Sequence, residues 1–180
     1  MERRLHIGGR EPRPGWEILN ILPGPDVDHV GDAVDLSRFA DGTFAEVYAS
    51  HVLEHFDYRQ GLALALREWH RVLAPGGVLR LSVPDIDTLS YLLLQRHKLD
   101  VNQRFEIMRM IFGGHVDAHD YHQVGLNQDF LGAYLGAAGF QRVQKVQRHG
   151  LFRDTSDMAV AGTAISLNLN AYKPVASVTA

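Results

Sequence analysis

Two short segments bring histidine and acidic side chains close together in the sequence. The first is His51-Val-Leu-Glu-His55, in which two imidazoles flank a carboxylate. The second segment packs five such side chains together: His115, Asp117, His119, Asp120 and His122. Imidazole and carboxylate groups transfer protons near neutral pH and also bind zinc or iron. The sequence therefore offers two candidate sites for acid–base or metal chemistry.

The first segment matches H-x-x-E-H, the inverted signature of zinc hydrolases, which places both histidines on one helix face. That signature needs a helix of its own and a further ligand downstream. Here it directly follows Glu46–Ser50, an apolar run that indicates a strand. We therefore keep zinc hydrolysis as a remote alternative. For the second segment we favour a polar loop that folds over the active site, and we expect no bound metal.

Composition indicates one ordinary globular domain. The chain has 180 residues, of which 46% are hydrophobic and 22% charged, and its net charge is −3. It holds no cysteine, which excludes disulfides and thiolate nucleophiles. No basic tract suits a nucleic-acid backbone, and no window approaches the roughly 18 apolar residues of a membrane span. We expect an unprocessed, soluble, cytoplasmic protein without nucleic-acid or membrane partners.

Short apolar runs alternate with helical patterns, which is typical of βα units and a mostly parallel sheet. The predicted strands are Leu5–Gly8, Glu17–Leu22, Asp28–Gly31, Glu46–Ser50, Val78–Val83, Gln141–Val146 and Ala164–Ala171. The predicted helices are Tyr58–Leu73, Thr88–Gln95, Asn102–Phe112 and Gln128–Ala138. The connection Gly9–Trp16 is too short for a full crossover helix. That helix is therefore expected to be shortened or absent, and Pro174–Ala180 to form a disordered tail.

Five motifs occur in a distinctive order: Asp32-Ala-Val-Asp-Leu36, Tyr48-Ala-Ser-His-Val-Leu-Glu-His55, Leu66-Arg-Glu-Trp-His-Arg-Val-Leu-Ala-Pro-Gly-Gly77, Ser82-Val-Pro-Asp85 and Ile165-Ser-Leu-Asn168. Over residues 5–173 this order resembles the type 11 class I methyltransferases, specifically a bacterial subgroup associated with glycan biosynthesis. The resemblance implies an α/β, three-layer, Rossmann-like sheet, mostly parallel with an antiparallel C-terminal strand. It also implies one domain over residues 1–173 and S-adenosyl-L-methionine (SAM) as cofactor.

The cofactor is expected beyond the carboxyl ends of the parallel strands, where open sheets bind ligands. Gly8 and Gly9 end the first strand, and without a Cβ they let the backbone approach a ligand or simply make a turn. By resemblance, Asn20 occupies the position that binds the ribose. Asp32 then faces the adenine amino group and Ala33 leaves room for the ring, although Asp32 could equally cap a short helix.

The resemblance places His51 beside the transferable methyl, as a base or as a group that orients the substrate, and Glu54 and His55 are expected to secure the turn that follows. Because a histidine pKa lies near neutrality, His51 is the first candidate to take the acceptor's proton and His122 the second. The predicted substrate contacts are Asp85, Asp120, Tyr121 and His122.

The resemblance implies O- or N-methylation of a small-molecule or glycan-type acceptor. The main alternative is an inactive methyltransferase-like module for binding or assembly. Arg10 stands in place of a third glycine and either intrudes on the cofactor or folds away, while Asn20 replaces an acid. Because too few helices are available to cover one face of the sheet, bare apolar surface and a homodimer are also expected.

Overall fold

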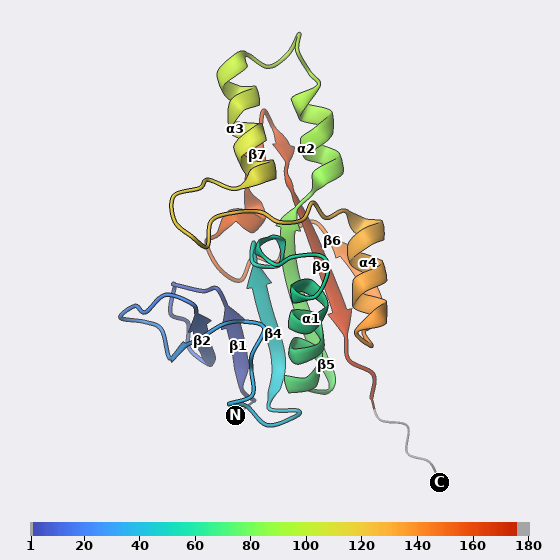
Figure 1. Ribbon diagram of the computed structural model, residues 1–180. Helices are drawn as coiled ribbons and strands as arrows, with labels where there is room; N and C mark the ends of the chain where they lie inside the picture. The colour runs from blue at the N-terminus through green and yellow to red at the C-terminus, as the bar shows by residue number, and fades with distance from the viewer. Residues whose placement is uncertain (1, 176–180) are drawn as a thin grey trace.

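A seven-stranded sheet forms the centre of the computed structural model, which describes residues 2–175; the rest of the predicted tail, 176–180, lies outside the described residues. The strand order is β3-β2-β1-β4-β5-β9-β6 (Figure 1). Strands β1 to β5 pair in parallel, whereas β9 runs antiparallel to both neighbours, β5 and β6. The predicted α/β class, with a mostly parallel sheet and an antiparallel C-terminal strand, is confirmed.

The bounds of the elements follow the predicted segments closely. The strands of the sheet are β1 (Arg4–Ile7), β2 (Trp16–Asn20), β3 (His29–Val30), β4 (Phe44–Ser50), β5 (Leu73–Pro84), β6 (Gln141–Val146) and β9 (Ser166–Tyr172). The α-helices are α1 (Gly61–Val72), α2 (Ile86–Leu93), α3 (Val101–Phe112) and α4 (Gln128–Ala137). A separate ribbon pairs β7 (Ala159–Val160) with β8 (Thr163–Ala164), and single 3-10 turns are η1 (Leu53–His55) and η2 (Thr155–Asp157).

Helix α1 packs on one face of the sheet through the residues whose spacing predicts it. Leu62, Leu66 and Trp69 recur at three- and four-residue steps, and all three are fully buried in the main core. The indole Nε1 of Trp69 also donates a hydrogen bond to the carbonyl of Ala33 at 2.9 Å. Helix α1 therefore fixes the loop that follows β3.

The other face of the sheet is covered by an irregular segment, residues 147–157. Successive residues of a strand point to opposite faces. In β1, Leu5 and Ile7 join the core beneath α1, whereas His6 packs against the ring of Phe152, with centroids 4.0 Å apart. Coil thus supplies the third layer here. The connection between β1 and β2 contains no helix, which confirms the predicted loss of the first crossover helix.

The same covering segment buries the polar side of β9. Alternation predicts one apolar and one polar face for this strand, yet Asn168 and Asn170 are both buried. The amide of Asn168 donates hydrogen bonds to the carbonyls of Gln147 and Ser156, each at 3.1 Å. Because buried polar groups need such partners, β9 can be polar on one side and still lie in the interior.

Strand β5 begins five residues before its predicted start. Leu73 already pairs with Phe44 of β4, and the register then shifts before regular pairing resumes at Val78. The sequence Pro75-Gly76-Gly77, which ends one of the five motifs, lies at this irregularity of the strand. A Cβ on Gly77 would lie 2.8 Å from the carbonyl oxygen of Ala74, which explains why glycine is needed at this close approach.

Helices α2 and α3 form a hairpin that extends past the carboxyl ends of the parallel strands (Figure 1). The chain returns from α3 through residues 113–127, which cross in front of those strand ends before α4 begins.

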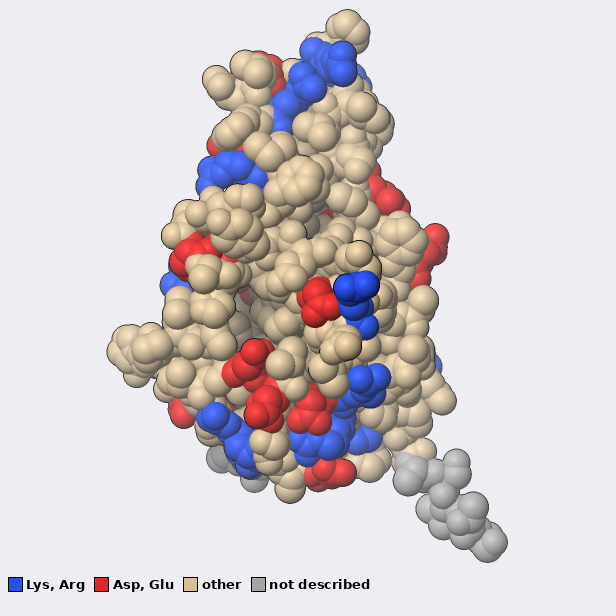
Figure 2. Space-filling view, in the orientation of Figure 1, with Lys and Arg blue, Asp and Glu red and all other residues tan. Residues whose placement is uncertain are grey.

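On the face drawn in Figure 2, acidic and basic side chains are interspersed at the lower end, opposite the α2–α3 hairpin. Among the described residues, no helix is both long and apolar enough to cross a bilayer.

Candidate functional site

A pocket of about 390 Å³ opens beyond the carboxyl ends of β1, β2 and β4. We call it the strand-end pocket. Five of the six residues predicted to contact the cofactor line it: Gly8, Asn20, Asp32, Ala33 and His51. Its volume falls in the range of roughly 300–1,000 Å³ that is typical of small-molecule sites.

The two glycines after β1 have different roles. Gly8 lines the pocket with a φ of 77°, a backbone conformation that favours glycine, and its N–H donates to the carbonyl of Leu19 at 2.8 Å. Gly9 does not line the pocket. It is buried, and a Cβ there would collide with the ring of His6. Gly9 therefore allows close packing against His6, and its contact with the cofactor stays a prediction.

The side chain of Asn20 holds the backbone around it. Its Nδ2 donates to the carbonyl of Gly9 and its Oδ1 accepts from the N–H of Leu22, both at 3.0 Å. The side chain is 94% buried, since the residue keeps only 6% exposure. Asn20 thus lines the pocket, and one of its donors and one of its acceptor sites are already used in hydrogen bonds to the backbone.

The two residues after β3 also combine structure with exposure to the pocket. Asp32 is exposed, and its Oδ1 accepts from the N–H of Val34 at 3.1 Å. The segment forms turns rather than the short helix considered for Asp32 as a cap. Ala33 is buried by α1 and presents only a methyl group. At this place the pocket wall therefore consists of a small apolar side chain, Ala33, next to the exposed carboxylate of Asp32.

Arg10 does not fill the strand-end pocket. It is exposed and lies at the lining, beside the open volume. Of the two outcomes considered for this side chain, the structure shows the one in which the guanidinium leaves space for a ligand.

A second pocket, of about 360 Å³, lies between the strand ends and α3, and we call it the α3 pocket. Asp120 and His122 line it, together with Arg109 and Met110 of α3. His51 and His55 line both pockets. The two spaces therefore meet at the histidines that follow β4.

His51 is held by a chain of two hydrogen bonds. Its Nε2 lies 2.9 Å from Oγ of Ser166, and that hydroxyl donates its only proton to the carbonyl of Thr155 at 2.9 Å. Nε2 must then carry the hydrogen, which leaves the lone pair on Nδ1. Burial, and secondly the nearby His122, lowers the pKa of His51 to about 4 instead of the near-neutral value expected. His51 is therefore neutral and weakly basic at pH 7.

Glu54 is the most unusual residue of the site. It is 1% exposed, and neither carboxylate oxygen has a hydrogen-bond partner within residues 2–175. Its Oε1 lies 3.4 Å from Nδ1 of His51 and 4.0 Å from Nε2 of His122. Burial raises the pKa of Glu54 to about 8. The expected role of this side chain in securing the turn is wrong; η1 is instead held by backbone bonds such as His55 N–H to the Val52 carbonyl.

The predicted substrate residues divide between the two pockets. Asp120 and His122 line the α3 pocket, and Tyr121 lines the strand-end pocket with its ring stacked on His115 at 4.0 Å. Asp85 lines neither pocket. Its carboxylate caps α2, accepting from the N–H of Asp87 and the hydroxyl of Thr88. Asp85 therefore has a structural role as a helix cap, and its contact with substrate stays a prediction.

Three site residues were not predicted. Val52 and Phe56 form apolar wall of the strand-end pocket, and Ser166 positions His51. Val52 lies within the His51–His55 motif and Phe56 directly follows it, and Ser166 belongs to the motif Ile165-Ser-Leu-Asn168. Their types gave no chemical signal, because aliphatic walls and single serines are common in any domain.

The strand order, with ligand-sized pockets at the carboxyl ends of β1, β2 and β4, defines a Rossmann-like α/β domain. The sequence profile of the methyltransferase domain family matches residues 20–81. No curated protein matches the sequence.

Solved structures share the fold at low identity. A SAM-dependent methyltransferase from Archaeoglobus fulgidus superimposes with a TM-score of 0.60 and 15% identity over 96% of this chain and 86% of that one. A possible exported protein from Bordetella parapertussis gives 0.58 and 14% over 97% and 63%. The CurJ carbon methyltransferase gives 0.55 and 20% over 96% and 48%, so this chain spans less than two thirds of the last two. The family match covers residues 20–81 of the 180, and the likeness to these solved structures shows that the chain shares their fold.

Proposed function

We propose that the chain transfers a methyl group from SAM to a hydroxyl or amine of a small-molecule or glycan-type acceptor. The observation that carries this proposal is the meeting of two pockets at His51. A transferase that forms no covalent enzyme intermediate needs two adjoining spaces, so that donor and acceptor are held in line.

The strand-end pocket suits the nucleoside part of SAM. Gly8 offers backbone without a side chain, Ala33 leaves room for a ring, and the Asp32 carboxylate is exposed at the wall. Bound there, SAM would supply an electrophilic methyl group on sulfur. Asn20 would contribute through its second N–H and its remaining lone pair, because one of each is already used.

His51 is better suited to orient the acceptor than to deprotonate it. A base with a pKa of about 4 has little driving force to remove a proton from a hydroxyl near pH 7. The hydrogen bond to Ser166 nevertheless fixes the ring, and the lone pair on Nδ1 can accept a hydrogen bond. We therefore assign His51 to alignment. Asp120 and His122 are proposed as acceptor contacts from the α3 pocket, and Tyr121 as one from the wall of the strand-end pocket.

Calorimetric titration with SAM and S-adenosylhomocysteine tests the proposal. Ala118→Trp places a large ring at the exposed lining of the strand-end pocket, and Ala133→Trp adds the same ring to the exposed face of α4 as a control. Binding by the wild type and the control, but a loss of at least tenfold in the first variant, supports the proposal. No binding by the wild type at millimolar cofactor would instead favour an inactive binding or assembly module.

The homodimer and the cytoplasmic location stay predictions. The homodimer is expected because bare apolar surface on the sheet would need a partner. Residues 147–157 cover this face at β1 and β4 through Phe152, which packs on His6 and Tyr48. A light-scattering mass of one chain at tens of micromolar would contradict the dimer.

A further inference from the structure

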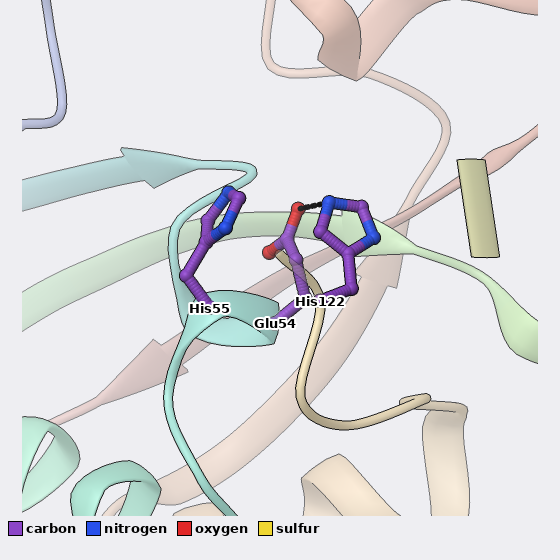
Figure 3. A group of neighbouring side chains, drawn as sticks. All are labelled: Glu54, His55 and His122. Carbon is purple, nitrogen blue, oxygen red and sulfur yellow. Dashed lines mark ion pairs between the residues drawn. The ribbon is translucent and has the colours of Figure 1, made fainter. Parts of the chain in front are cut away.

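We propose that Glu54, His55 and His122 form a binding site for a divalent transition-metal ion at the wall of the α3 pocket. Each of the three residues offers one ligand atom, and these atoms lie within 4.8 Å of one another. Glu54 and His55 come from η1, and His122 comes from the segment that returns after α3 (Figure 3). Two parts of the chain 67 or more residues apart thus bring two imidazoles and a carboxylate together.

The buried side chain of Glu54 is the first feature that favours a metal ion. Glu54 is almost completely buried, and neither of its oxygens accepts a hydrogen bond from the described residues. Burying an unpaired carboxylate is costly, so such groups normally have a partner or coordinate a metal. Nε2 of His122, at 4.0 Å from Oε1, is beyond hydrogen-bonding distance. An ion between them would satisfy both groups.

The orientation of the His55 imidazole also favours a metal ion. Nδ1 of His55 lies 3.2 Å from the carbonyl of Tyr121, and only a protonated Nδ1 can bond to that oxygen. The lone pair of His55 is therefore on Nε2. Histidines that bind metals usually donate their other ring N–H to such a carbonyl, which fixes the ring and its tautomer.

The spacing of the three ligand atoms, and the open pocket beside them, leave room for an ion. Bonds of about 2.1 Å place tetrahedral ligands about 3.4 Å apart, so side-chain movements on the order of 1 Å would close the site. Glu54, His55 and His122 all line the α3 pocket, which leaves open coordination positions on its side. Two imidazoles, one carboxylate and an open position are typical of catalytic zinc and non-haem iron sites.

This inference rests on the proposed function for its role. A cation facing the α3 pocket would lower the pKa of an acceptor hydroxyl and so supply the activation that His51 lacks. The hydroxyl loses its proton to water, the oxygen forms a bond to the methyl carbon, and the carbon–sulfur bond breaks with its electron pair left on sulfur. The products are the methyl ether and S-adenosylhomocysteine.

The test titrates Zn²⁺ into chelator-treated, untagged protein by calorimetry. One equivalent should bind, and Glu54→Gln and His122→Gln should each lose at least about tenfold in affinity. His97→Gln, which removes an exposed histidine near the tip of the hairpin, should bind like the wild type. Circular dichroism verifies that the variants fold; if Glu54→Gln unfolds, the partly exposed His122 carries the comparison.

Three outcomes would overturn the site. They are no Zn²⁺ binding by the wild type, unchanged affinity in folded Glu54 and His122 variants, or an equal loss in the His97 control. Co²⁺ absorption adds a second readout, since a four- or five-coordinate site gives intense visible bands that the His122 variant should lack. SAM binding is measured separately: SAM without Zn²⁺ binding overturns the metal site alone, and Zn²⁺ without SAM binding overturns the proposed function alone.

Discussion

The amide of Asn20 donates a hydrogen bond to the carbonyl of Gly9 at 3.0 Å and thereby ties the β1–β2 connection to the end of β2. This contact replaces part of what the missing crossover helix would provide. It also explains why an amide is tolerated where the resemblance calls for an acid. A carboxylate could accept from Leu22 but would face the Gly9 carbonyl without a proton to donate.

Asn20→Asp should therefore lower the free energy of unfolding by about 1–3 kcal/mol, because it leaves a buried carbonyl without its donor. Urea unfolding at pH 7 measures the effect. Asn102→Asp, in the exposed first turn of α3, is the matched control and should be neutral or slightly stabilising. An Asn20 variant as stable as the wild type would show that the contact contributes nothing.

His51→Asn should separate alignment from cofactor binding. Asparagine tolerates the φ of 54° at this position and removes the imidazole without a large backbone cost. We expect SAM affinity to stay within about threefold while methyl transfer falls by about a hundredfold. Release of S-adenosylhomocysteine with a panel of sugar and amine acceptors measures transfer. Equal losses in affinity and transfer would show that His51 contributes to the cofactor site instead.

The hydrogen bond from Tyr48 to Asp154, at 2.6 Å, should hold the covering segment on the sheet. Tyr48 is fully buried, and its partner is a carboxylate, so Tyr48→Phe should cost about 1.5–3 kcal/mol of unfolding free energy. Tyr91→Phe on exposed α2 should cost almost nothing. If the two variants unfold at the same urea concentration, the segment is held by its apolar contacts alone.

His6 should make the fold sensitive to acid. Burial lowers its pKa from 6.5 to about 4, against smaller opposing contributions from Asp154 and Glu11. Between these two pH values the unfolded chain binds a proton at His6 and the folded chain does not. The free energy of unfolding therefore decreases as the pH falls below 6.5, and this decrease ends near pH 4. The loss attributable to His6 is about 3 kcal/mol.

His6→Phe keeps an aromatic ring against Phe152 and removes the titration. Urea unfolding at pH 7, 5.5 and 4 should show a shallower decline for this variant than for the wild type. Parallel declines would assign the acid sensitivity to other groups, of which His51, with its pKa lowered to about 4 by burial, is the first candidate.

Local patterns predicted most of the fold. The spacing of Leu62, Leu66 and Trp69 indicated α1, and glycines marked where strands end, because these signals act within a few residues. The tertiary roles of polar side chains were harder to predict. Asp85 follows a strand as a ligand-binding acid would, yet it caps the helix that begins next to it.

The site was predicted in its parts but not in its pairings. His51, Glu54 and His122 were all noticed in the sequence, and two of them were assigned to catalysis. What brings Glu54 to His122 is the return of the chain after α3, a contact across 68 positions that no local pattern encodes. Likewise the burial that weakens His51 as a base comes from the assembled pockets and not from its neighbours in sequence.

A crystal structure with S-adenosylhomocysteine bound would show directly which pocket holds the cofactor. We predict the adenosyl group in the strand-end pocket, beside Gly8 and Ala33, with the sulfur directed toward His51 and the α3 pocket left open for the acceptor. An adenosyl group in the α3 pocket, or a strand-end pocket that stays empty at saturating ligand, would contradict the account.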